Sequence, residues 1–179
     1  MSRIGSMPII IPQNISVELL ENNVTVSSSK GSSSFILNYG IECKIQDGKL
    51  FLINNKKLAK SKAMWGTYRS CINNLIQGYS QGFCAELEVK GVGYKVENYN
   101  DKSLLVSVGY SHGIIYSVPD DIDVKCVKST QILINGISKE RVSMLASEIC
   151  SLRKYNVYKG KGIFIKGKVM RRKEINKKK

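Results

Sequence analysis

Residues 41–53 read Ile-Glu-Cys-Lys-Ile-Gln-Asp-Gly-Lys-Leu-Phe-Leu-Ile. Apolar side chains stand at the first, third and fifth positions, the alternation typical of a half-buried strand. Asp47-Gly48 is a dipeptide that favours a tight turn between antiparallel strands, and residues 49–53 follow as the partner strand. The stretch therefore predicts a β-hairpin with one buried face.

The sequence on either side of this hairpin predicts more strands and a helix. Residues 23–27 and 34–37 are β-branched or apolar and flank a turn at Lys30-Gly31, which indicates a second hairpin. Residues 7–12, with prolines at both ends, indicate an edge strand or an extended arm. A helix is predicted from about residue 60 to 77, with Gly78 as its C-terminal cap. Its apolar face is formed by Met64, Tyr68, Cys71, Ile72, Leu75 and Ile76.

The second half of the chain runs through the same order. Strands are predicted over 85–96, 104–108, 114–118, 122–126 and 131–134. Ser138 is a good N-cap for a second helix that ends near Arg153. Offsets of about 80 residues relate Gly31 to Gly113 and Ile41 to Ile122.

These offsets indicate an internal duplication and therefore an α+β fold of two tandem small domains. In each domain we expect an antiparallel sheet to bury one face under one main helix. The expected boundaries are 1–82 for the N-terminal domain, 83–170 for the C-terminal domain and 171–179 for a basic tail.

Residues 158–163, Tyr-Lys-Gly-Lys-Gly-Ile, have the composition of an anion-binding loop. Glycine permits positive φ and close backbone approach, lysine offers a point charge to a phosphate, and tyrosine offers a face for a base. The alternative is a solvated glycine turn whose lysines only aid solubility. In the first half, residues 78–83 occupy the matching place without lysines. The first domain is therefore expected to be a scaffold or a protein contact.

The charge of the chain favours a polyanionic partner. Lys and Arg number 28 against 14 Asp and Glu, a net charge of +14. From Arg153 to the end Glu174 is the only acid, and such like-charged blocks are common nucleic-acid contacts. An anionic membrane surface is the weaker alternative, because no apolar run approaches the roughly 20 residues of a spanning helix.

The sequence gives little support to an enzyme or a metal protein. His112 is the single histidine and has no obvious carboxylate partner. The five cysteines are widely separated, and none forms a Cys-x-x-Cys pair. Gly91 and Gly93 are interpreted as a β-bulge or a close backbone approach. We therefore expect no cofactor, no metal and no small-molecule substrate.

Several motifs, taken together, resemble the bacterial-type ribosomal protein L6 family along nearly the whole chain. They are Met1 to Gly5 with Pro8 and Pro12, Gly66-Thr67 with Arg69-Ser70, Gly91 to Tyr94, Val108 to His112, Tyr158 to Ile163, and Arg171 to Lys173 with the lysine end. The resemblance implies two copies of one α+β fold and a structural role in the large ribosomal subunit. It also implies binding to large-subunit rRNA near the sarcin–ricin loop, beside neighbouring proteins of the stalk base.

Combined with the basic segments, the resemblance gives an expected set of rRNA-binding residues. They are Gly91, Gly93, Tyr94, Lys95, His112, Tyr158, Lys159, Gly160, Lys161, Gly162, Lys166, Lys168, Arg171, Arg172 and Lys173. One departure is that Tyr155-Asn156-Val157 replaces the family's Pro-Glu-Pro, from which a less rigid approach to the loop is expected.

Two alternatives stay open. The abundance of Asn, Lys, Ile and Ser, with no transit segment at the start, favours a protein encoded in a mitochondrion, and a bacterium is the second possibility. A free-standing RNA- or DNA-binding regulator is the alternative to a ribosomal component.

Overall fold

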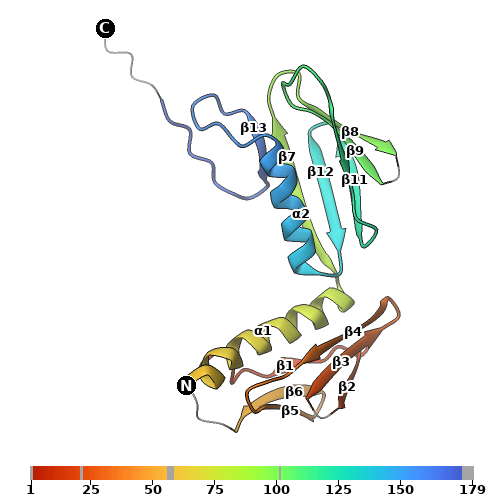
Figure 1. Cartoon of the computed structure of the whole chain (residues 1–179), viewed down its shortest axis with the longest axis vertical. Coiled ribbons are helices and arrows are strands. Elements are labelled where there is room, and N and C mark those ends of the chain that lie inside the picture. Colours follow the sequence, from red (N-terminus) through yellow and green to blue (C-terminus); the bar gives the residue numbers. More distant parts are fainter. Residues whose placement is uncertain (1, 21, 56–58, 101, 175–179) are drawn as a thin grey trace. The chain divides into compact units, whose positions relative to one another are not determined.

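The computed structural model describes residues 2–20, 22–55, 59–100 and 102–174 (Figure 1). The chain divides into two compact units, residues 1–82 and 83–179. No helix in the described ranges is long and apolar enough to cross a membrane.

Unit 1 contains two three-stranded antiparallel sheets and one long helix. The first sheet has the order β1 (Ile9–Ile10), β6 (Lys49–Asn54), β5 (Ile41–Gln46). The second has the order β2 (Ser16–Leu20), β3 (Asn23–Ser28), β4 (Gly31–Ile36). Helix α1 (Ala59–Ser80) contacts β3, β4 and β6. As predicted, residues 41–53 form a hairpin, β5–β6, and the proline-flanked segment is an edge strand, β1.

Unit 2 repeats this arrangement and adds one strand. Its larger sheet has the order β11 (Ile122–Lys128), β12 (Gln131–Gly136), β7 (Phe83–Lys90), β13 (Gly162–Ile165). Its smaller sheet has the order β10 (Ile114–Ser117), β9 (Ser103–Ser107), β8 (Lys95–Asn100). Helix α2 (Lys139–Leu152) contacts β7, β12 and β13 (Figure 1).

The strand orders confirm the predicted α+β fold and its duplication. Sheet β5-β6-β1 corresponds to β11-β12-β7, and β2-β3-β4 corresponds to β8-β9-β10. Strand β13 extends the second copy by pairing with the free edge of β7, where Ile163 lies opposite Val89. Among the described residues unit 1 has no strand at this position. The duplicated fold therefore becomes asymmetric at β13 and at the loop that leads into it.

The core of unit 2 follows from two periodicities. Alternate residues of the sheet, such as Leu87 and Ile134, are fully buried. Helix α2 presents Val142, Leu145, Ala146 and Ile149 to them, the spacing of one helical face. Each buried Val, Leu or Ile side chain contributes about 1.5–3 kcal/mol. The core thus fixes the C-terminal end of α2, from which the basic loop begins.

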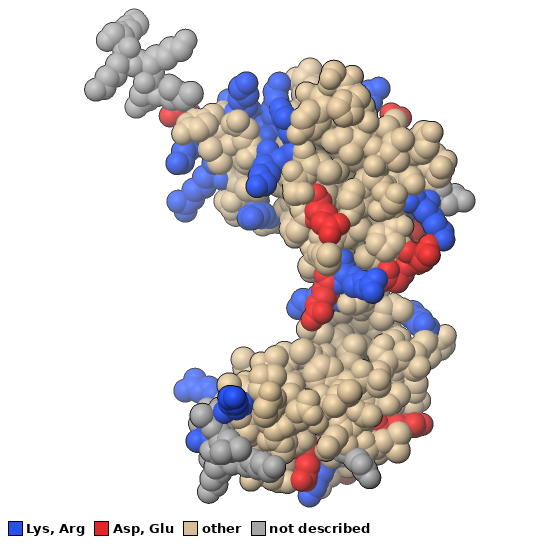
Figure 2. All heavy atoms as spheres, viewed as in Figure 1, with Lys and Arg blue, Asp and Glu red and all other residues tan. Residues whose placement is uncertain are grey.

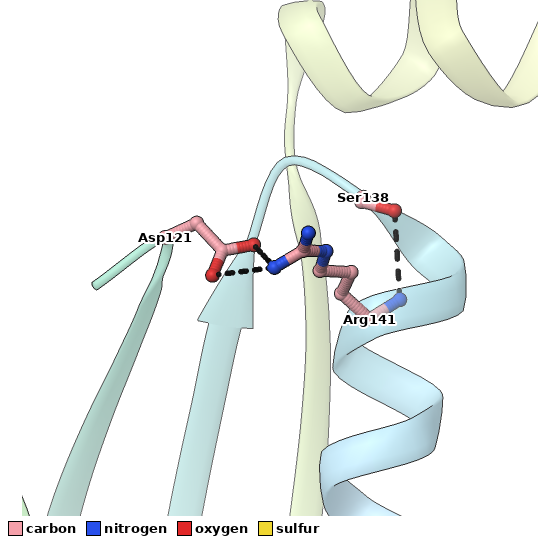
Figure 3. Close-up of polar contacts among 3 residues, drawn as sticks. All are labelled: Asp121, Ser138 and Arg141. Carbon is pink, nitrogen blue, oxygen red and sulfur yellow. Dashed lines mark hydrogen bonds and ion pairs between the residues drawn. The ribbon is translucent and has the colours of Figure 1, made fainter. Parts of the chain in front are cut away.

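The start of α2 confirms the predicted N-cap. The Ser138 side chain accepts a hydrogen bond from the Arg141 amide at 3.5 Å, and the Arg141 guanidinium contacts Asp121 at 3.1 Å (Figure 3). Because both charged groups are exposed, the ion pair contributes at most about 1 kcal/mol. The helix ends at Arg153, which takes an extended backbone conformation, as expected.

The end of α1 differs from the prediction. Gly78 lies inside the helix, which continues to Ser80 because Tyr79 is buried and bonds its hydroxyl to the Ser33 hydroxyl at 2.6 Å. Gly82, with φ of 77°, terminates the segment instead, and its amide donates to the Gln77 carbonyl. The expected equivalence between the loop at residues 78–83 and the basic loop is therefore wrong, since residues 78–80 are helical.

Two further features differ from the sequence-based expectations, one of them the bulge that was one of two interpretations of Gly91 and Gly93. Strand β2 was not predicted, because it is an edge strand whose two leucines are only partly covered. Residues 91–94 do not continue the strand and form no bulge. They make a tight turn in which the Tyr94 amide donates to the Gly91 carbonyl at 3.2 Å and Gly93 has φ of 76°.

Candidate nucleic-acid interface

The loop between α2 and β13 is held together by Asn156. Its side-chain oxygen accepts hydrogen bonds from the amides of Tyr158 and Lys159 at 2.9 and 3.0 Å. Its carbonyl accepts from the Gly160 amide, and its own amide donates to the Lys161 carbonyl, both at 2.8 Å. Asparagine commonly bonds the backbone two residues on in this way. This loop lacks the prolines that the family has before it. The hydrogen bonds of Asn156 restrain it instead.

Replacing Asn156 by alanine is expected to loosen this loop. Two amides lose their acceptor, and each hydrogen bond is worth about 0.5–1.5 kcal/mol. The amides of Tyr158 and Lys159 should exchange with solvent faster, as measured by NMR. Asn156→Asp is the matched control, because it keeps an oxygen acceptor and should keep the protection. Unchanged exchange in the alanine variant would contradict the assigned restraint.

The two glycines of the loop have different roles. Gly160 has φ of 69°, and a Cβ there would come no closer than 3.7 Å to the Tyr155 hydroxyl. Gly162 is buried, has φ of 142°, and a Cβ would lie 2.6 Å from Tyr155 Cα. The structure corrects the expected role of Gly162: its missing side chain makes room for the chain's own backbone. Of these two glycines, only Gly160 has room for a partner to approach its backbone.

The segment after β13 returns to the basic loop. The Lys173 amide donates to the Val157 carbonyl at 3.0 Å, and Arg172 Nε donates to the Tyr158 carbonyl at 3.2 Å. Arg171 is exposed beside them. The start of the tail and the Tyr158 loop thus form one surface, whereas Lys177–Lys179 lie outside the described residues.

A cleft of about 680 Å³ lies behind this loop. It is lined by the turn at residues 91–94, by the turn at 109–110 and by the chain from 151 to 161. Its charged lining residues are Arg153, Lys154, Lys159 and Lys161. No acidic side chain is among the described residues that line it. The fold thus brings two predicted lysines together with two cations that the prediction omitted.

An aromatic stack stands at the edge of this cleft. Arg153 Cζ lies 5.0 Å from the centre of the Tyr110 ring, and the His112 ring stacks on Tyr110 at 6.4 Å. The Tyr110 hydroxyl donates to the Leu152 carbonyl at 3.1 Å, which fixes the ring. Hydrogen bonds to Tyr110 and Tyr94 raise the pKa of Arg153, a guanidinium that is cationic at neutral pH in any case. Arg153 and Tyr110 were not among the rRNA-binding residues expected from the sequence. Arg153 is the first residue of the basic run, and Tyr110 lies in the same motif as His112.

Tyr94 is mostly core rather than surface. Its side chain is only 9% exposed, and Cβ atoms at Gly91 or Gly109 would lie within 3 Å of its ring. The glycines therefore accommodate the ring, which leaves Tyr94 little area on which to stack a base. Gly93, in contrast, has open space where a Cβ would stand.

The remaining predicted residues lie outside the cleft. The Lys166 ammonium pairs with the Glu86 carboxylate at 2.5 Å, and this hydrogen bond raises the pKa of Lys166. Its charge is therefore already partly neutralised within the chain. Lys168 lies in a neighbouring depression beside Cys150. Lys95 is exposed at the start of β8.

Cationic side chains gather on the side of unit 2 that carries the Tyr158 loop and β13. Between residues 153 and 174 nine Lys and Arg are accompanied by one acid, Glu174. Figure 2 shows Lys and Arg side chains gathered in the region of β13 and the segment that follows it, with few acids nearby. Such a single-sign field raises the local concentration and the association rate of a polyanion.

Comparison with known proteins finds consistent similarity. The family described as Ribosomal protein L6 matches residues 11–82 and 90–164. Large ribosomal subunit protein uL6 of Paramagnetospirillum magneticum is 40% identical over 179 residues, covering 99% of this chain and all of the relative. Large ribosomal subunit protein uL6m of Reclinomonas americana is 42% identical over 186 residues, with the same coverage. The corresponding uL6 of Thermotoga neapolitana is 36% identical over 184 residues, again covering 99% and 100%.

Proposed function

Because the chain belongs to the ribosomal protein L6 family, we propose that it is a structural component of the large ribosomal subunit that binds large-subunit rRNA. The family is structural rather than enzymatic, and the chain is not an enzyme. The proposed partners are this rRNA and neighbouring large-subunit proteins.

One observation carries the rRNA part of the proposal. The Tyr158 loop and the start of the tail are hydrogen-bonded into one surface, which presents Lys159, Lys161, Arg171, Arg172 and Lys173 together. All five side chains are exposed, and none has an ion-pair partner among the described residues. Phosphate contacts from Lys and Arg supply most of the sequence-independent affinity for nucleic acid.

The finer location rests on the family resemblance. We place the bound rRNA near the sarcin–ricin loop and the base of the factor-binding stalk. A mitochondrial ribosome is the proposed compartment, supported by the Asn, Lys, Ile and Ser content of the sequence, with the bacterial cytoplasm as the alternative. Relatives named uL6 and uL6m match about equally well, so similarity does not separate these two compartments.

Sedimentation tests the ribosomal role. A tagged copy of the chain, expressed in its own cells, is expected to co-migrate with large subunits in a sucrose gradient. Dissociating the subunits at low magnesium should leave the chain with the large subunit, which is the control against trapping between subunits. A chain found only in the soluble fractions would favour the free-standing RNA- or DNA-binding regulator instead.

A salt titration tests the electrostatic part. Five phosphate contacts are expected to give log K against log salt a slope of about −4, since each contributes about −0.7 to −0.9. The measurement is fluorescence anisotropy with a large-subunit rRNA fragment, and sucrose of equal osmolality is the control. A flat titration would rule out phosphate neutralisation as the basis of binding.

A further inference from the structure

The cleft behind the Tyr158 loop is too small for an RNA helix and has the size of a small-ligand site. Its volume of about 680 Å³ lies within the range of pockets that enclose one small ligand, roughly 300–1,000 Å³. A double helix would therefore rest on the rim, where the exposed lysines stand. Only a group that has left the helix can enter.

The lining of the cleft provides a flat cationic surface. The Arg153 guanidinium is held over the Tyr110 ring, and that ring is fixed through its hydroxyl. Unstacked RNA bases stack on aromatic rings and on guanidinium planes. Val92, 89% exposed, adds apolar surface at the rim.

The same cleft provides charges for a phosphate. Lys159 and Lys161 enter its lining from the Tyr158 loop, and Lys154 enters it from the end of α2. Asn156 orders the backbone that carries the two loop lysines. A flat cationic surface next to several ammonium groups matches the two parts of one nucleotide, a base and its phosphate.

We propose that this cleft binds one unpaired nucleotide of the RNA, with the base against Arg153 and Tyr110 and the phosphate against Lys159 and Lys161. The proposal rests on the RNA binding proposed above and adds which form of RNA the chain prefers. Unit 2 recognises RNA with an extruded nucleotide rather than an uninterrupted duplex.

The test compares two RNA duplexes of equal length, measured with the full chain. In one, a single 2-aminopurine is bulged out. In the other, it is paired with uracil. The bulged RNA is expected to bind about tenfold more tightly, the order of one stacked base, and its fluorescence should fall on binding.

Variants then locate the effect. Arg153→Lys keeps the positive charge but removes the planar guanidinium, and Tyr110→Leu removes the aromatic ring. Each should bring the two affinities to within about twofold of one another, because the preference for the bulged RNA is lost. Tyr99→Leu is the matched control, since Tyr99 is 56% exposed on β8 and lies outside the cleft. Thermal unfolding checks each fold, and Arg153→Lys alone carries the test if Tyr110→Leu does not fold.

The outcomes separate the two proposals. Equal wild-type affinity for both RNAs overturns the nucleotide site but leaves the rRNA binding intact. A tenfold preference that survives Arg153→Lys overturns the assigned residues. If neither RNA binds, the nucleotide site is overturned, and the titration with the large-subunit rRNA fragment decides separately whether the chain binds rRNA.

Discussion

Replacing Lys159, Lys161, Arg171, Arg172 and Lys173 together by glutamine is expected to remove most of the affinity for large-subunit rRNA. These five cations project from one surface, in which the tail is bonded to the Tyr158 loop. Losing five phosphate contacts should lower the affinity roughly a thousandfold near 0.2 M salt and reduce the salt slope by about four. Fluorescence anisotropy over a range of salt concentrations measures both quantities.

A matched control comes from unit 1. Replacing Lys30, Lys44, Lys49, Lys60 and Lys62 by glutamine removes the same charge from residues outside the proposed interface. Its salt slope should change by less than about one. Equal losses in the two variants would show that binding follows net charge and not the surface formed by the loop and the tail.

Replacing Gly162 by alanine is expected to destabilise unit 2 strongly. The added Cβ would lie 2.6 Å from Tyr155 Cα and 2.9 Å from the Lys154 carbonyl oxygen, both backbone atoms that cannot rotate away. The backbone φ of 142° adds strain for any L side chain. Together these costs amount to about 2–5 kcal/mol, or a fall in Tm of roughly 10–30 °C. Thermal unfolding followed by circular dichroism measures the change.

Gly160→Ala is the control for this prediction. It also sits at positive φ, but its Cβ would meet nothing closer than 3.7 Å, so only the conformational cost of about 1–2 kcal/mol applies. Equal destabilisation by the two substitutions would contradict the assigned backbone clash. Loss of RNA binding in Gly162→Ala is expected to follow unfolding, and binding should return at temperatures where the variant is folded.

Local signals in the sequence were enough to predict most of the elements. Alternating apolar residues, the Asp47-Gly48 turn and the Ser138 cap act over a few residues, and all three have the predicted conformation. The internal repeat predicted the tandem α+β architecture because strand order within each copy is set by short connections. The basic run from Arg153 likewise needed no structure, since charge depends on composition alone.

Contacts between residues far apart in the sequence decided where α1 ends and which charges are free. The buried Tyr79 extends α1 past Gly78 through a bond to Ser33, 46 residues away in sequence. Lys166 looks like any other lysine of the basic run, yet it is paired with Glu86, 80 residues away. Helix ends and free charges therefore cannot be assigned from local sequence where a tertiary partner competes.

The composition of the candidate site was decided in the same way. Tyr94 and Tyr110 both follow glycines in family-like motifs, but packing buries the first and leaves the second 46% exposed under Arg153. The cleft forms only because two turns and the chain after α2 converge, and no local pattern records that convergence. The sequence by itself determined that unit 2 is cationic and which residues form its helix and most of its strands. Tertiary packing alone decided which of its side chains face a partner, because burial and close contact depend on residues far apart in the chain.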